Sequence, residues 1–125
     1  MLVWSAGDNP AVADHLDLTR SDGQAVCRAR VAGSFAARFC GLMGAADLPA
    51  GQGMLFPGTS SVHTHFMRFR IDVVFLDDER RIVAIKPALG PWRMASANGA
   101  RSVLELVAGE CARLGLAVGD VLVER

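Results

Sequence analysis

The sequence predicts a mostly β fold, a compact barrel or sandwich of short, mainly antiparallel strands with one or two short helices. Short apolar segments are separated by turn residues at intervals of about eight to twelve residues, a spacing typical of sandwiches and barrels. Helical periodicity is too brief to alternate with strands as βαβ units require. At 125 residues the chain has room for one hydrophobic core.

The N-terminal part predicts a flexible segment followed by a β-hairpin. Residues 1–12 include Gly, Asp, Asn and Pro without periodicity, so we expect them to be flexible and a single domain to span residues 13–125. Polar and apolar residues alternate in His15–Thr19 and again in Ala25–Val31. Between them, Ser21–Gln24 contains Asp-Gly, which favours a turn joining two antiparallel strands.

A short helix is predicted next. Phe35, Phe39 and Leu42 recur at a spacing that places them on one helical face. Ser34 can cap the start of this helix and Gly44 can end it. The apolar face of the helix should therefore lie on the sheet.

The rest of the chain predicts further strands. The clearest signal is a hairpin of Ile71–Leu76 and Ile82–Ile85 joined by Asp77–Arg80, and we expect this pair at the centre of the core. The remaining expected elements are the strands Met54–Phe56, Ser61–Phe66, Ser102–Val107 and Val121–Val123, and one or two helical turns over Gly109–Leu114.

Charge and composition narrow the partner classes. The 13 basic residues balance the 13 acidic ones, so the molecule as a whole is not attracted to polyanions and we expect no nucleic-acid partner. Apolar runs are too short for a membrane span, which needs about twenty residues. We expect a monomer or a homodimer that binds an unknown small ligand or protein partner.

Cysteine usage favours a reducing compartment. Cys27, Cys40 and Cys111 are odd in number and far apart, so they suggest neither a disulfide framework nor a C-x-x-C motif. The first residues lack the basic start and apolar run of a secretory signal. We therefore expect a cytoplasmic location for the chain as given, or export if a leader has been removed from it.

Four motifs of the sequence occur in a known family. They are Arg38–Gly44, Gly53–Phe56, Ile71–Asp77 and Val103–Gly109. In their order and spacing they are similar to the family called domain of unknown function 192, and the resemblance covers roughly residues 14–123. It implies a compact β-rich domain, found alone or behind a signal peptide in bacteria and archaea, and it implies no reaction, substrate or cofactor.

One segment departs from this family pattern. Relatives usually read HTFGMRFPID where this chain reads HTHFMRFRID at residues 63–72. His65, Phe66 and Arg70 thus replace Phe, Gly and Pro. Any chemistry that depends on His65 would belong to this protein and not to the family.

A metal site is one hypothesis for this segment. His63, His65 and Met67 alternate along the expected strand, so their side chains would leave one face. Imidazole and thioether are suitable ligands for copper or zinc. A stable site needs three or four ligands and no other segment supplies a ligand pair, so we favour an ordinary half-buried strand face and expect no other cofactor.

Two carboxylates are placed where burial would be costly. Asp72 lies among apolar residues and needs a charged partner or backbone amides. Arg38 or Arg68 would make it a structural clip, and the alternative is a tuned acid or base in a pocket. Glu105 lies between two leucines and should point to the opposite face from them, toward solvent or an Arg.

These residues suggest a single cleft. We hypothesise that Arg38, His63, Asp72 and Glu105 meet there, near Trp92 on a Pro-containing loop. Trp92 would anchor a ligand or partner, or cover the end of the barrel. The favoured function is a non-enzymatic ligand- or partner-binding accessory module. The alternative is a small enzyme, a hydrolase or metal-dependent, with a carboxylate as base and Arg38 holding an anion.

Overall fold

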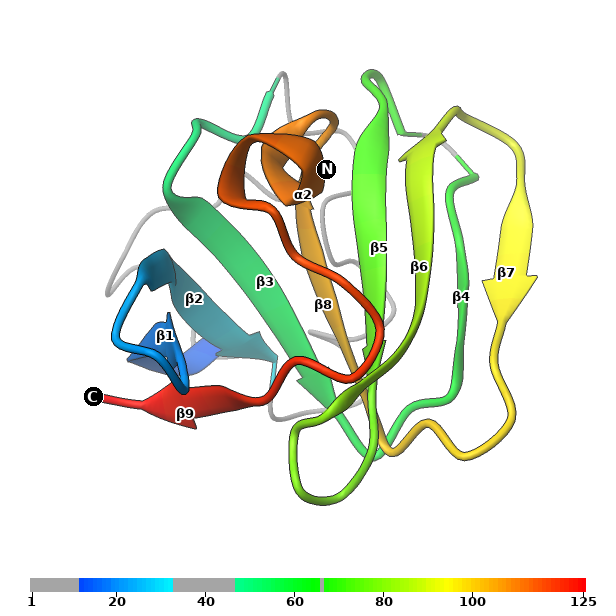
Figure 1. Ribbon diagram of the computed structural model, residues 1–125. Coiled ribbons are helices and arrows are strands. Elements are labelled where there is room, and N and C mark those ends of the chain that lie inside the picture. Colours follow the sequence, from blue (N-terminus) through cyan, green and yellow to red (C-terminus); the bar gives the residue numbers. More distant parts are fainter. Residues whose placement is uncertain (1–11, 33–46, 66) are drawn as a thin grey trace.

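The structure, a computed structural model, describes residues 12–32, 47–65 and 67–125. Its main feature is a seven-stranded sheet with the order β6-β5-β8-β3-β2-β1-β9, which curls into a half-barrel (Figure 1). Two further strands form a separate small sheet. The predicted mostly β class is confirmed. The elements within the described residues are β1 (Val12–Arg20), β2 (Ala25–Ala32), β3 (Gln52–Pro57), β4 (Ser61–His63), β5 (Ile71–Leu76), β6 (Ile82–Leu89), β7 (Met94–Ser96), β8 (Ser102–Val107), α2 (Glu110–Leu114) and β9 (Leu122–Glu124).

The first hairpin is confirmed, with β1 and β2 paired antiparallel. Its turn is closed by the Arg20 N–H, which donates to the Gln24 carbonyl at 2.8 Å. The Asp22 carboxylate accepts the Gln24 N–H at 3.0 Å. Gly23 adopts a φ of 97°, a conformation that other residues rarely accept. The Asp-Gly pair from which the turn was predicted therefore stabilises that turn.

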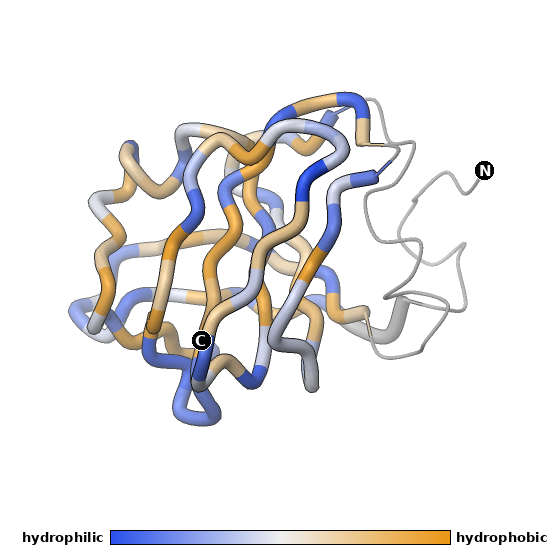
Figure 2. Tube along the Cα trace, turned by 90° about the vertical axis from the view of Figure 1, so that its right-hand side faces the viewer, coloured by the Kyte–Doolittle hydropathy of each residue, from blue (hydrophilic) through white to orange (hydrophobic). Residues whose placement is uncertain are grey.

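The central strands are buried on both faces, because all six residues of β5 are buried and so are four of the six in β8. Alternate side chains of a strand point to opposite faces, and Figure 2 shows apolar residues along the strands. Two apolar clusters result. One contains Leu55, Val74, Leu76, Leu104 and Leu106 together with side chains of α2 and its following loop. The other contains Met54, Phe56, Val73, Phe75 and Val103, and side chains of β4 and β7 pack on it.

Strand β6 differs from the expectation in place and length. Its hairpin with β5 is confirmed, but β6 lies at the edge of the sheet, so β5 and β8 form the centre. The strand continues beyond Ile85 to Leu89 through a β-bulge, in which Pro87 and Ala88 stand opposite the single residue Asp72. A proline inside an apparent strand is tolerated here because β6 is an edge strand.

The small sheet also differs from the expectation. Strand β4 ends at His63, whereas the alternation had predicted a strand to residue 66. The alternation of His63, His65 and Met67 along one strand face is therefore wrong. The partner strand β7 has no clear signal in the sequence, since it pairs only three residues.

The two edges of the large sheet approach each other at one end. The Ile82 N–H donates to the Asp120 carbonyl and the Gly119 N–H donates to the Ile82 carbonyl, both at 2.8 Å. The Leu122 N–H donates to the Arg80 carbonyl at 2.9 Å. The segment that leads into β9 therefore bonds to the start of β6 while β9 itself pairs with β1, and this closes one end of the half-barrel.

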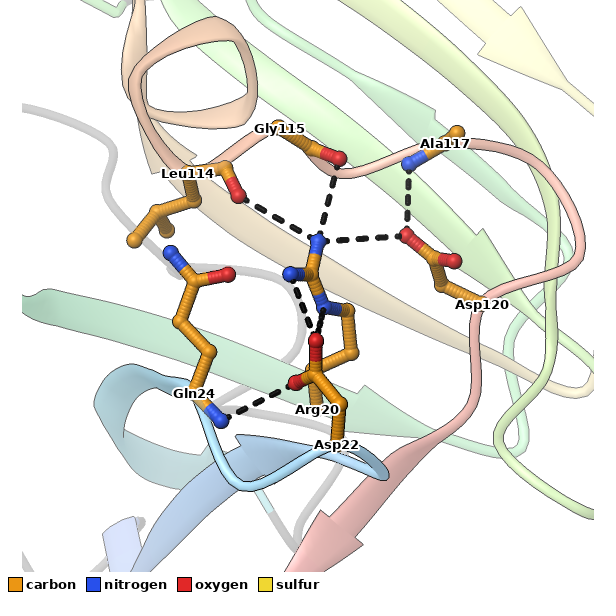
Figure 3. A network of polar contacts seen from close by, with 7 residues as sticks. All are labelled: Arg20, Asp22, Gln24, Leu114, Gly115, Ala117 and Asp120. Carbon is orange, nitrogen blue, oxygen red and sulfur yellow. Dashed lines mark hydrogen bonds and ion pairs between the residues drawn. The ribbon is translucent and has the colours of Figure 1, made fainter.

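Arg20 fixes the C-terminal end of α2 (Figure 3). Its guanidinium donates to the carbonyls of Leu114 and Gly115 at 3.4 and 3.2 Å. These are the carbonyls that the end of a helix leaves without intrahelical partners. Ion pairs with Asp22 at 2.8 Å and Asp120 at 3.8 Å hold the guanidinium in place. One side chain thus connects the first hairpin, the helix and the segment before β9.

The remaining expectations fall as follows. The strands expected at residues 102–107 and 121–123 are confirmed as β8 and β9, and the helical turns expected at 109–114 are confirmed as α2, each within one residue at either end. The strand expected at 54–56 lies within β3. The helix expected over 34–44 lies outside the described residues, as do residues 1–11 of the expected flexible segment.

Gly53 is a position where one methyl group should matter. A Cβ added there would lie 3.0 Å from Cys27 Sγ, 3.1 Å from Leu106 Cδ2 and 3.2 Å from Leu104 Cδ1. Overpacking of this kind costs about 1–3 kcal/mol, which exceeds the gain of up to about 1 kcal/mol expected from Ala over Gly in a strand. Gly53→Ala should therefore lower the free energy of unfolding, measured by urea titration followed by circular dichroism.

Gly90→Ala is the matched control. Its Cβ would meet only the flexible guanidinium end of Arg70, 3.2 Å away, so its unfolding free energy should stay within about 0.5 kcal/mol of the parent. A Gly53→Ala variant as stable as the parent would contradict the tight packing at β3.

Candidate functional site

Asp72 is a buried carboxylate held by backbone amides. Its exposed fraction is 1%. The Ala88 N–H donates to Oδ1 at 2.9 Å, and the N–H groups of Gly109 and Cys111 donate to Oδ2 at 3.1 and 2.9 Å. The first of these belongs to the bulge of β6 and the other two to the start of α2. From its place on β5, Asp72 therefore caps the start of α2 and also accepts an N–H group of the bulge in β6.

This finding decides between the hypotheses for Asp72. A structural clip was expected from Arg38 or Arg68, but the partners found are backbone amides. Arg68 is exposed, Arg38 lies outside the described residues, and no ion pair to Asp72 occurs in the part of the chain that the structure describes. With three N–H groups donating to it, the carboxylate serves a structural role.

Glu105 is the second buried carboxyl group, and it lies in a different environment. Its exposed fraction is 5%. It stands opposite Met54 of β3 and Val73 of β5, in the apolar cluster beneath the small sheet. Burial raises the pKa of this carboxyl group to about 8. Its side chain was expected to point toward solvent or an Arg, and the expectation of solvent is wrong because both faces of β8 are covered.

The structure does not bring Asp72 and Glu105 together. In the β5–β8 pair Asp72 stands opposite Leu106 and Glu105 stands opposite Val73. Side chains of adjacent positions point to opposite faces, so the two carboxyl groups lie on opposite faces of the sheet and do not line one cleft. His63 lies on the small sheet.

Thr64 clamps the loop that carries Trp92. Its side chain is fully buried, and its hydroxyl donates to the Gly90 carbonyl at 2.6 Å and accepts the Arg93 N–H at 2.9 Å. Its backbone N–H donates to the Arg93 carbonyl at 2.8 Å, and its carbonyl accepts the Trp92 N–H at 3.1 Å. Sequence reasoning missed Thr64, although its place between two histidines was a signal.

Trp92 stands on this loop in an unusual conformation. Its φ is 61°, in the left-handed region that side chains rarely adopt. Its exposed fraction is 62%, so most of the indole surface faces solvent. The expectation that Trp92 would cover the end of the barrel does not fit this exposure, whereas an anchor for a ligand or partner does.

Four side chains form one group beside this clamp, which we call the His–Trp–Met cluster: His63, His65, Trp92 and Met94. The rings of His63 and His65 are stacked with centroids 4.8 Å apart. The rings of His65 and Trp92 are tilted at 47° with centroids 5.1 Å apart. Met94 stands opposite His63 in the β4–β7 pair and has an exposed fraction of 74%.

The metal ligands expected from the sequence are therefore only partly brought together. Met67 is buried in the apolar cluster below the small sheet, while Met94 is the thioether paired with His63. Within residues 12–32, 47–65 and 67–125, no group of three His, Cys, Asp or Glu side chains is placed to hold a metal ion.

The described cysteines belong to the core. Cys27 and Cys111 are both buried with free thiols. The pKa of each thiol is raised to about 12, mainly by burial, and for Cys111 the charge of Asp72 contributes to this rise. The thiolate is the reactive form of cysteine, so neither is suited to act as a nucleophile. Cys40 lies outside the described residues.

Fold and site together define a small β domain, a half-barrel closed at one end and carrying an exposed cluster of imidazole, indole and thioether groups. The chain belongs to the DUF192 family, described as "Uncharacterized ACR", whose pattern matches residues 17–123. This confirms the resemblance found in the motifs. No helix of the described residues is long and apolar enough to span a membrane.

Three similar proteins have descriptions that state no established activity. A UPF0127 protein of Thermococcus sibiricus is 34% identical over 98 residues, which is 74% of this chain but only 63% of the relative. A crystal structure of a putative transcription regulator from Sinorhizobium meliloti has a TM-score of 0.81 at 24% identity, covering 93% of this chain and 97% of that one. A protein of unknown function from Novosphingobium aromaticivorans has a TM-score of 0.78 at 25% identity, covering 98% and 99%.

Asp72→Asn should destabilise the fold strongly. The amide keeps one acceptor oxygen, and its NH2 group would face at least one N–H that now donates to the carboxylate. A buried donor without an acceptor costs about 1–3 kcal/mol and bonds to a charged group are worth more than neutral ones, so we expect a loss of about 2–4 kcal/mol in urea unfolding.

Asp77→Asn is its control. In Asp77 one oxygen, Oδ1, accepts the N–H groups of both Glu79 and Arg81 at 2.9 Å. Asn retains that oxygen, so the loss should stay below about 1 kcal/mol. Equal losses in the two variants would contradict the role assigned to Asp72.

Glu105→Gln should change the pH dependence of stability. Because the folded pKa of about 8 lies above the ordinary value of 4.5, the parent loses stability as pH rises between these values. Gln does not titrate, so the variant should gain about 2 kcal/mol relative to the parent between pH 5 and pH 7. Unfolding titrations at both pH values measure this gain.

Glu110→Gln should show the opposite sign. Its carboxylate bonds to Arg113 at 2.7 Å, which lowers the pKa of Glu110. The stabilisation it contributes is present above the ordinary pKa and lost at lower pH, so this variant should lose stability relative to the parent as pH rises from 3 to 6. If the difference in unfolding free energy between Glu105→Gln and the parent did not change with pH, the carboxyl group of Glu105 would be ionised in the folded protein.

Proposed function

We propose that this domain is a non-enzymatic binding module that holds a small ligand at the His–Trp–Met cluster. The observation that carries the proposal is the clamp of Thr64 on the loop of Trp92. A fully buried hydroxyl fixes a loop whose principal side chain is exposed. Rigid aromatic side chains presented to solvent are typical of binding surfaces.

The backbone strain at Trp92 supports this proposal. A left-handed conformation in a residue other than Gly costs about 1–3 kcal/mol and persists only when its surroundings impose it. The hydrogen bonds between Thr64 and the loop impose it here. The backbone conformation that orients this exposed indole therefore lowers the stability of the fold, and packing alone does not require it.

The enzyme alternative has less support. It needs a carboxylate base near Arg38 and His63, but the oxygens of Asp72 already accept three N–H groups. Glu105 has a raised pKa suited to proton transfer, yet it is buried and on the opposite face from Asp72. Asp72 and Glu105 therefore do not act on one substrate together.

A small ligand is proposed in preference to a nucleic acid. The Sinorhizobium structure is described as a putative transcription regulator. In this chain basic and acidic residues are equal in number, so the nonspecific attraction on which DNA binding depends is missing for the molecule as a whole. The cluster itself offers stacking and coordination.

Native mass spectrometry of the chain purified from its own host without chelators tests the proposal. We expect a bound mass on the parent that Trp92→Ala reduces, because the exposed indole is part of the contact surface. Val118→Ala, at another exposed apolar side chain, should retain the bound mass. A parent that carries only its own mass, or an undiminished bound mass on Trp92→Ala, would count against a ligand at this cluster.

The same experiment tests the clamp through Thr64. Thr64→Val removes the hydroxyl and keeps the shape, so it should release the loop and reduce the bound mass. Thr64→Ser keeps the hydroxyl and should preserve the bound mass. Circular dichroism of both variants separates a released loop from an unfolded chain.

A further inference from the structure

We infer that the ligand of the His–Trp–Met cluster is a copper(I) ion, held by imidazole nitrogens of His63 and His65 and the thioether of Met94, with the indole of Trp92 beside it. The inference rests on the proposed function and names its ligand. It replaces Met67, the thioether expected from the sequence, with one on the neighbouring strand.

His63 and Met94 are close cross-strand partners. The Thr64 N–H donates to the Arg93 carbonyl at 2.8 Å, one residue beyond this pair on each strand. That bond makes His63 and Met94 a non-hydrogen-bonded pair, in which the Cα atoms are about 4.5 Å apart and the side chains are closest. The thioether therefore lies next to the imidazole on the exposed face of the small sheet.

His65 supplies the second nitrogen. The rings of His63 and His65 are stacked with centroids 4.8 Å apart, so the two imidazoles lie side by side. Because the nitrogen lone pairs lie in the ring planes, one ring turns out of the stack before a nitrogen of each can bond the same ion at about 2.0 Å. Each imidazole has two nitrogens, so either ring can bind a metal through one and keep a hydrogen bond through the other.

Trp92 completes the site without being a ligand. A cation within about 6 Å of an indole face is attracted by the ring quadrupole. The indole centroid is 5.1 Å from that of His65, so an ion bound to His65 on that side falls within this range. The Thr64 clamp holds the ring there before the ion arrives.

The ligand types select the metal. Thioether sulfur is a soft ligand that favours copper(I), whereas zinc prefers thiolate, imidazole and carboxylate. The described part of the chain offers no third His, Cys, Asp or Glu at this position. A set of two nitrogens and one thioether is therefore suited to copper(I) and incomplete for zinc.

Neighbouring positive charge has only a small effect on the affinity of the site for copper(I). Arg93 lies in the same loop and is exposed. A unit charge about 8 Å away in water weakens cation binding by about twofold, and salt at physiological concentration reduces this further. Such an effect is small beside the loss of a coordinating ligand.

Anaerobic titration with copper(I) buffered by bicinchoninate tests the inference. We expect the parent to withdraw one copper(I) per chain from the coloured chelate. Met94→Leu should weaken this affinity by at least about tenfold, since even indirect partners of a metal contribute that much. Met67→Leu, at a buried methionine of the core, should bind as the parent does. In a Trp4→Phe background, copper(I) should also quench the fluorescence of Trp92.

Each other result would overturn the inference. No binding by the folded parent, or equal binding by Met94→Leu, removes copper(I) or its thioether ligand. Zinc(II) bound as tightly and without loss in Met94→Leu would indicate a histidine site for harder metals. If the chain binds no copper(I) but native mass spectrometry finds a bound mass that is not a metal, only the copper(I) inference is rejected. If neither experiment finds a bound ligand, the proposed binding module is rejected as well.

Discussion

The buried carboxylate of Asp72 needs hydrogen-bond donors, and this need is the constraint on which the rest of the fold depends. A charge taken out of water needs partners, and this one collects N–H groups from the bulge of β6 and the start of α2. A five-residue helix is too short to be stable alone. It persists because Asp72 holds its first turn and Arg20 holds its last carbonyls, so the apolar cluster beneath it remains covered.

Burial of the central strands on both faces creates a second requirement. The face of β5 and β8 away from α2 also carries apolar side chains, and the small sheet of β4 and β7 covers them. That sheet turns Val62 and Ala95 inward. Alternation along its strands then places His63 and Met94 outward, toward solvent. The exposed cluster is therefore a direct result of how the second face of the sheet is covered.

Much of the architecture could be predicted from the sequence, since turn residues between alternating segments locate the first hairpin, β5, β8 and the last strand. Local signals failed where distant backbone determines the outcome. The strand expected over Ile82–Ile85 continues past Pro87, because Asp72 accepts the N–H of Ala88 in the bulge. Glu105 was placed on the correct face relative to its leucine neighbours, but only the tertiary fold covers that face. The site depended on Thr64 and Met94, which meet their partners across separate segments, so spacing along the chain did not reveal them.

The contact between β6 and the segment before β9 has a consequence for association between molecules. An unpaired edge strand can template the addition of a strand from another chain, and folded proteins protect such edges with bulges, prolines and lysines. Here the first part of β6 is already bonded to residues 119–122, and the later part carries Lys86, Pro87 and the bulge. At the opposite edge β9 offers only three residues. The half-barrel thus protects both edges of its sheet against the addition of a strand, although its strands do not form a complete barrel.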